Sequence, residues 1–182
     1  MSAEQIQIMS EVAIRFALTA VLTMISAIAW KRSRTADTIA QGYSIGRSFA
    51  CAPYPVRAIV FWGLIEVAFS IWWKVSSELP VAHVVAIVTV YMLKWVIIVL
   101  CMLKGHKWPR FYFLIAGGLT LVDGMVVQIR THAVNASSLN HLLNGFLGIV
   151  LYYLLTMDES IKWRDTIRAV PIKSQNTKAE EK

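Results

Sequence analysis

Residues 56–103 constrain this chain more than any other stretch, because they hold two long apolar runs joined by a short polar turn. The runs read VRAIVFWGLIEVAFSIWWKV and VAHVVAIVTVYMLKWVIIVLCML, and residues 76–80 lie between them. A helix of about 20 apolar residues spans the roughly 30 Å hydrocarbon core of a bilayer. The stretch therefore predicts a helical hairpin that crosses a membrane twice.

Each run carries one charged residue well inside it, Glu66 in the first and Lys94 in the second. Glu66 follows Arg57 by nine positions and Lys94 precedes Leu103 by nine, which places both charges about 13 Å deep if those two ends share a membrane face. A charge that faces lipid at this depth costs about 3 kcal/mol or more. The sequence predicts that these two residues pair inside the bundle, and it leaves open whether the pair fixes the hairpin or takes part in an ion relay.

The composition extends this prediction to the whole chain. Of its 182 residues, 57% are hydrophobic and only 16% are charged, which is too apolar for a soluble domain. We expect an all-α, polytopic membrane helix bundle with a transmembrane domain over residues 1–160 and a cytoplasmic tail over residues 161–182, and the lipid bilayer as its first partner. The net charge of +7 lies largely in short loops beside apolar runs, where it directs topology, so we do not expect nucleic-acid binding.

A first span is predicted over residues 12–30. It is the least apolar of the candidates, and its Arg15, Thr19, Thr23 and Ser26 share one helical face, so that face should pack against other helices. The other interpretation is a cleaved signal peptide, since residues 27–29 have the small-x-small form of a cleavage site. The residues before Arg15 lack the basic character that such a signal needs.

The fourth and fifth spans are predicted over residues 111–129 and 139–157. In the fourth, Ala116, Thr120 and Gly124 recur every four residues and predict a close-packing face. Asp123 lies beside this face, at a depth that predicts a second intramembrane pair, with Arg15 of the first span.

The basic residues predict the orientation. Five lie in residues 31–57, three in residues 104–110 and six in the tail, out of 18 Lys and Arg in all. By the positive-inside rule the N-terminus lies outside, five helices cross the membrane and the C-terminus lies inside, in a bacterial inner membrane. The tail sequence DESIKWRDTIRAV predicts a short amphipathic helix on the membrane surface, followed by a disordered end.

The residues that carry chemistry in enzymes form no motif here. His83, His132 and His141 fall on or near the predicted outer face, but they lack metal-ligand spacing, so we expect neither a metal site nor a cofactor. Nucleophile-elbow, P-loop and dinucleotide glycine patterns are absent from the sequence. We therefore expect no enzymatic activity.

Two segments near the C-terminus carry a resemblance. KGHKWPRFYFLIAGG, followed about 40 residues later by YYLLTMDESIKW, resembles small bacterial polytopic inner-membrane proteins of unassigned activity. In those proteins a basic loop with a G-x-x-W-x-R pattern precedes a span, and a terminal span ends in a polar S-x-x-W. The resemblance covers roughly the last 80 residues and implies topology alone; the extra first helix departs from the four-span form.

These observations favour two functions. The first is a non-enzymatic protein that binds another membrane-embedded partner, most concretely an immunity protein against a membrane-acting toxin. The alternative is a small transporter or ion-translocating subunit that uses Glu66, Lys94 and Asp123, for which homo-oligomers would line the path. An intramembrane enzyme built on the outer histidines and Asp123 is a third hypothesis.

Overall fold

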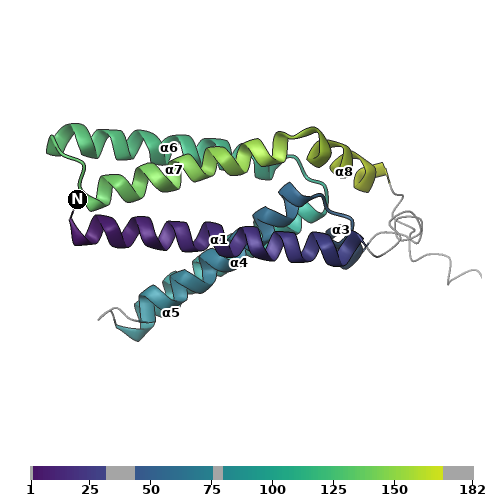
Figure 1. Ribbon diagram of the computed structural model, residues 1–182, viewed down its shortest axis with the longest axis horizontal. Coiled ribbons are helices and arrows are strands. Elements are labelled where there is room, and N and C mark those ends of the chain that lie inside the picture. Colours follow the sequence, from purple (N-terminus) through teal and green to yellow (C-terminus); the bar gives the residue numbers. More distant parts are fainter. Residues whose placement is uncertain (1, 32–43, 76–79, 170–182) are drawn as a thin grey trace, which may run out of the picture.

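The computed structural model describes residues 2–31, 44–75 and 80–169, and within them every regular element is a helix. The helices are α1 (Ala3–Lys31), α3 (Ile45–Ala50), α4 (Tyr54–Val75), α5 (Val81–Leu103), α6 (Trp108–Thr131), α7 (Ala136–Thr156) and α8 (Asp158–Ala169) (Figure 1). Five of them, α1 and α4 to α7, are long and apolar enough to cross a membrane. The predicted all-α polytopic bundle is confirmed.

The helix ends agree closely with the predicted spans except at the start of the chain. The first span was expected to begin at residue 12, but α1 begins at Ala3. Ser2 and Gln5 explain the earlier start, because the Gln5 backbone N–H donates to Ser2 Oγ (3.2 Å) and the Ser2 backbone N–H donates to Gln5 Oε1 (2.8 Å). This reciprocal capping satisfies backbone donors at a helix N-terminus. The same device, made by Asn135 and Ser138, starts α7.

Helices α6 and α7 form the closest pair in the bundle, and glycines permit the contact. A Cβ atom on Gly148 would lie 2.6 Å from the Cα of Gly117, and one on Gly117 would lie 2.9 Å from the Gly145 carbonyl oxygen. Gly124, from the predicted close-packing face, also meets α7, since its Cβ position lies 3.0 Å from the Leu142 nitrogen. The contact of α6 with α7 therefore includes Gly117 besides Gly124.

The helices converge at one end and separate at the other. Figure 1 shows α4 and α5 diverging from α6 and α7 toward the end where α1 begins. The buried apolar cluster lies at the converging end and includes Ile59, Ile98, Met102, Leu155 and Trp163. Apolar packing thus closes one end of the bundle and leaves the other end free for polar side chains.

Arg57 links three helices at the converging end of the bundle. Its buried guanidinium donates hydrogen bonds of 2.7 Å to the backbone carbonyls of Ser26, Ala50 and Ala52, so one side chain joins α1, α3 and α4. Cys51 lies beside it between α3 and α4. Burial raises the pKa of the Cys51 thiol, and the positive charge of Arg57 offsets part of that increase. This thiol is therefore a weak nucleophile at neutral pH.

The polar stripe of α1 packs inward as expected, since Thr19 and Thr23 are buried. Their hydroxyls donate to the carbonyls of Arg15 (2.8 Å) and Thr19 (2.7 Å) on the same helix. The two threonine hydroxyls are therefore satisfied within α1, as the interior of a membrane bundle requires.

The predicted tail helix is present as α8, and it packs against the bundle. The Trp163 indole N–H donates to the Ser48 carbonyl (3.3 Å) and the Ser160 hydroxyl donates to the Leu154 carbonyl (2.7 Å). Since α8 begins at Asp158, the predicted domain boundary at residue 160 falls inside its first turn. Residues 76–79 of the predicted polar turn at residues 76–80, and the end predicted to be disordered after Pro171, lie outside the described residues.

We predict that Gly148→Ala destabilises the protein while Gly118→Ala does not. The new methyl group at 148 meets the backbone of α6, so α6 and α7 must separate, at a cost of about 1–3 kcal/mol. The Cβ position of Gly118 has no atom within 4 Å. Unfolding of both purified variants in a detergent titration measures the difference, and equal midpoints would contradict the close contact.

Candidate functional site

A cavity of about 690 Å³ lies between the diverging helices, and all five candidate spans contribute to its wall. Its charged and polar lining includes Glu4, Glu11, Glu66, Arg15, Lys94, Asn140, His141 and Asn144. The volume lies within the range of small-molecule sites. A cavity that collects both acids and bases within spanning helices is the strongest candidate for a functional site.

One wall is the predicted ion pair between α4 and α5, which is confirmed. Lys94 Nζ lies 3.4 Å from Glu66 Oε1, and the Trp62 indole N–H donates to Glu66 Oε2 (3.2 Å). The Lys94 ammonium also lies 4.5 Å from the centre of the Tyr91 ring, close enough for a cation–π contact. Both charges are therefore compensated where they line the cavity.

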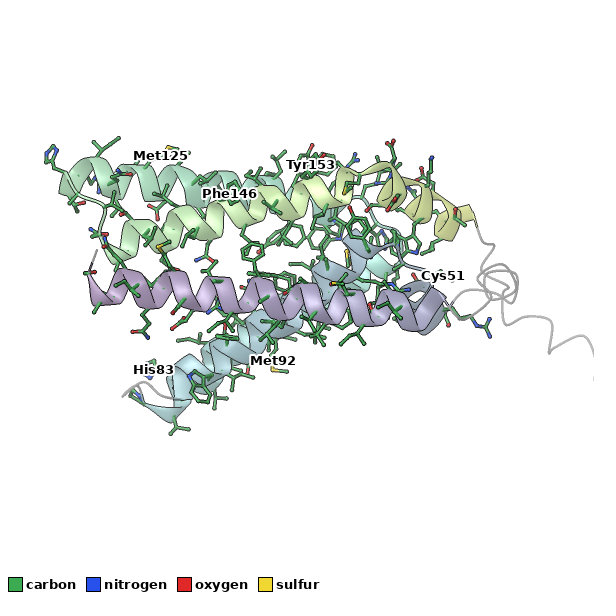
Figure 2. The ribbon with its side chains drawn as sticks, viewed as in Figure 1. Cys51, His83, Met92, Met125, Phe146 and Tyr153 are labelled. Atoms are coloured by element: carbon green, nitrogen blue, oxygen red, sulfur yellow. The ribbon has the colours of Figure 1, made fainter. Side chains whose placement is uncertain are left out.

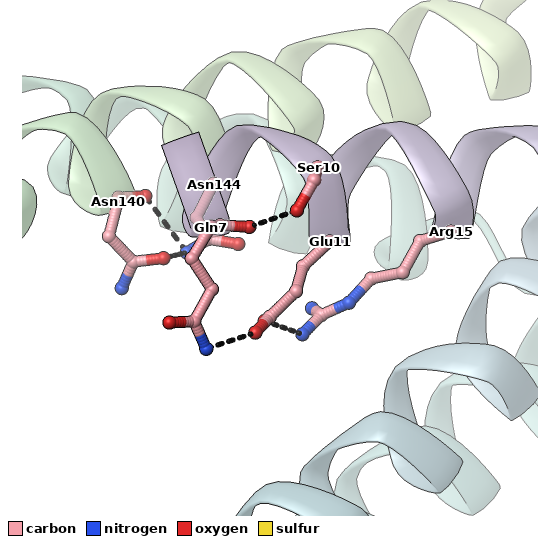
Figure 3. Close-up of polar contacts among 6 residues, drawn as sticks. All are labelled: Gln7, Ser10, Glu11, Arg15, Asn140 and Asn144. Carbon is pink, nitrogen blue, oxygen red and sulfur yellow. Dashed lines mark hydrogen bonds and ion pairs between the residues drawn. The ribbon is translucent and has the colours of Figure 1, made fainter. Parts of the chain in front are cut away.

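A second wall is one face of α1. Glu4, Ile8, Glu11 and Arg15 all line the cavity, and their spacing places them on one side of a helix with 3.6 residues per turn. Arg15 Nη2 lies 3.6 Å from Glu11 Oε2, and the Gln7 side-chain amide donates to Glu11 Oε1 (3.2 Å) (Figure 3). The helical spacing of these four residues is visible in the sequence, but the predicted first span begins only at residue 12 and so leaves out Glu4, Ile8 and Glu11.

The predicted pair between Arg15 and Asp123 is wrong. Arg15 pairs with Glu11, and Asp123 Oδ2 lies 2.6 Å from Nδ1 of His141 on α7. The early start of α1 explains the error, because it places Arg15 twelve positions after Ala3, about 18 Å along the helix. The glycine contact between α6 and α7 meanwhile brings His141 beside Gly124, next to Asp123.

His141 Nδ1 and Asp123 Oδ2 lie within ion-pair distance of each other, but their geometry does not meet the criteria for a hydrogen bond. The contact is therefore attractive chiefly when the imidazole is protonated. His141 lines the cavity, whereas Asp123 is not among the lining residues and its side chain is 59% exposed. Asp123 therefore does not belong to the charged lining.

The wall formed by α7 offers amide groups. The Asn144 side-chain amide donates to both the carbonyl oxygen and the Oδ1 of Asn140, each at 2.9 Å (Figure 3). Two further donors of lining residues, Arg15 Nε and Trp95 Nε1, have no hydrogen-bond partner within the described part of the chain. Unpaired buried donors are costly, so water or a solute in the cavity would stabilise them.

The cavity lies at the end of the bundle where α1 begins. Its lining runs from Glu4 and Ser137, near the starts of α1 and α7, to Phe113, Leu147 and Leu151. These last three side chains belong to the buried apolar cluster. Polar groups therefore reach inward from the face where α1 begins, and apolar packing ends the cavity before the opposite face.

The three histidines that were predicted on the outer face do not form a cluster. His83 is exposed near the start of α5, on the arm that diverges from α6 and α7 (Figure 2). His132 follows α6 with a left-handed φ of 48°, and His141 lines the cavity. Over the described ranges, no group of three or more His, Cys, Asp or Glu residues could hold a metal ion.

We predict that Glu66→Gln and Lys94→Met each destabilise the protein, by about 1–3 kcal/mol, because each leaves a partly buried charge without its partner. The double variant should regain part of this loss, giving a coupling of about 0.5–3 kcal/mol. Unfolding midpoints of the four proteins in one detergent measure the coupling. Strictly additive losses would contradict a direct pair.

In comparisons with known proteins, no protein-family model, no curated protein and no solved structure matches this chain. The resemblance to small bacterial inner-membrane proteins therefore stays a prediction. The geometry of the site is the basis for a functional conclusion.

Proposed function

We propose that this integral membrane protein binds a small polar solute or ion in the cavity and translocates it across the bilayer. The observation that carries the proposal is the collection of two ion pairs, from α1 and from the α4–α5 hairpin, in one cavity walled by all five candidate spans. Charged side chains within spanning helices typically mark solute or ion pathways.

The further polar groups strengthen this proposal over a purely structural pair. A single ion pair in an apolar bundle serves packing as well as it serves transport. Here Glu66 and Lys94 share their cavity with Glu11, Arg15 and Asn144, so a solute in the cavity meets polar groups along the wall. Such groups replace the water that a solute loses in the membrane.

The lining also indicates the chemistry of the solute. Acidic and basic side chains of Glu66, Glu11, Lys94 and Arg15 line the same space, so neither a lone cation nor a lone anion matches it fully. A zwitterion, or an ion that moves together with a proton, fits a wall that carries both signs.

We predict that vesicles containing the protein show a permeability that Glu66→Gln lowers about tenfold or more, the effect of losing one interaction of about 1.4 kcal/mol. The probes are protons with a trapped pH-sensitive dye, sodium, and radiolabelled zwitterionic amino acids. Glu159→Gln is the matched control, because Glu159 is exposed on α8 and is not among the lining residues, and it should keep the wild-type rate. Wild-type vesicles no more permeable than empty ones to all three probes would contradict the proposal.

Binding of another membrane protein, including immunity against a membrane-acting toxin, is the second candidate. The diverging arm supports it, because Val81, Val85 and Val90 of α5 are 78%, 58% and 65% exposed and would accept a partner helix as readily as lipid. Co-expression with the product of the neighbouring gene tests this candidate. Cells that need this chain to survive that product would favour it, and normal growth without the chain would contradict it.

A further inference from the structure

A second, basic cleft lies at the opposite end of the bundle, where the connection between α5 and α6 meets α8. It has a volume of about 20 Å³, and its lining includes His106, Lys107, Arg110, Ser160, Trp163 and Arg164. This volume holds about one water-sized oxygen atom, so a whole solute cannot enter the cleft. It admits a single oxygen of a larger group that rests at the mouth.

The charge of the cleft is strongly positive. Lys107 and Arg110 come from a connection, residues 104–110, that contains no acid. Arg164 is the one lining base with an acidic contact among the ion pairs described, since Asp165 Oδ1 lies 3.3 Å from its Nη2. Arg110 Nε is buried without a hydrogen-bond partner in the described structure, so this guanidinium presents a donor that an anionic oxygen would satisfy.

The start of α6 adds to the positive field at the cleft. Helix α6 begins at Trp108, and its N-cap residue Lys107 makes no side-chain capping hydrogen bond. The first-turn N–H groups are therefore not satisfied by a cap, and the helix dipole places partial positive charge at this end. A phosphate group carries both negative charge and several acceptor oxygens, so it suits the N-terminus of a helix.

The cleft is held in shape by close backbone contacts. Gly105 has a φ of +76°, and a Cβ atom there would lie 2.9 Å from Arg168 Cγ and 3.3 Å from the Arg164 carbonyl oxygen. The backbone of the loop therefore packs directly against α8 at Gly105. The hydrogen bond from Trp163 to the Ser48 carbonyl fixes α8 against α3.

We propose that this cleft binds the phosphate of an anionic phospholipid headgroup. Helix α5 ends at Leu103 and α6 starts at Trp108, so the cleft lies at the level where two spanning helices leave the hydrocarbon. Headgroup phosphates concentrate at that level, and basic pockets between transmembrane helices recognise them. Trp108, which is 40% exposed, is placed as an interfacial anchor beside the lipid.

The test measures thermal unfolding of the full chain in detergent micelles, with phosphatidylglycerol or phosphatidylcholine added at equal mole fractions. We expect phosphatidylglycerol to raise the midpoint by about 2–4 °C more than phosphatidylcholine does. The double variant Lys107→Gln, Arg110→Gln should lose this increment. Arg130→Gln should keep it, because Arg130 lies in the last turn of the same helix, at its other end.

Two further measurements complete the test. Lys107→Gln alone changes an exposed side chain, and the number of phosphatidylglycerol molecules that this variant retains in native mass spectrometry should fall even if the double variant does not fold. Inorganic phosphate should not reproduce the increment. Equal effects of the two lipids, an increment kept by the variants, or full reproduction by inorganic phosphate would each overturn the lipid site.

Discussion

The structure depends on one constraint, that a charge carried into hydrocarbon must find its compensation within the protein. The pair of Glu66 and Lys94 meets this constraint and ties α4 to α5 at the same depth. Facing lipid, either charge alone would cost several kcal/mol. Because both side chains must face the interior of the bundle, they set the rotation of α4 and α5 about their axes. They also create a polar wall inside an otherwise apolar bundle.

The remaining architecture makes room for that wall. Glycine contacts bring α6 and α7 together along their length, while the buried apolar cluster and Arg57 close the end of the bundle near α3. The helices can then separate only toward the other end, where Glu11 and Arg15 of α1 line the opening. Close packing on one side and charge on the other together produce a cavity at the end of the bundle where α1 begins.

Much of this was predictable, because apolar run length and charge depth are local properties of the sequence. The third span was predicted at residues 81–103, the bounds of α5, and equal depth alone identified the partner of Lys94. The start of α1 was missed because polar residues near a terminus look like a solvated end. The capping pair Ser2 and Gln5 was the available signal.

The partner of Asp123 and the contact of Gly117 with α7 could not be derived in the same way. They depend on which helices touch and at what rotation, and depth estimates do not determine either. His141 reaches Asp123 because Gly124 lets α7 approach α6, and this is a consequence of tertiary packing. The cavity itself has the same origin, since its lining comes from five helices whose mutual angles no local pattern specifies.

The most direct test of the central claim is a spin-label scan along residues 3–23 of α1 in reconstituted vesicles, with Cys51 and Cys101 replaced by alanine. Collisions with a water-soluble nickel chelate report aqueous exposure, and collisions with oxygen report lipid exposure. We expect nickel maxima at residues 4, 8, 11 and 15, which line the cavity, and oxygen maxima at Ile6, Met9 and Ile14, which are exposed on other sides of the same helix. Oxygen exceeding the nickel chelate at residues 8, 11 and 15 would contradict a hydrated cavity inside the membrane.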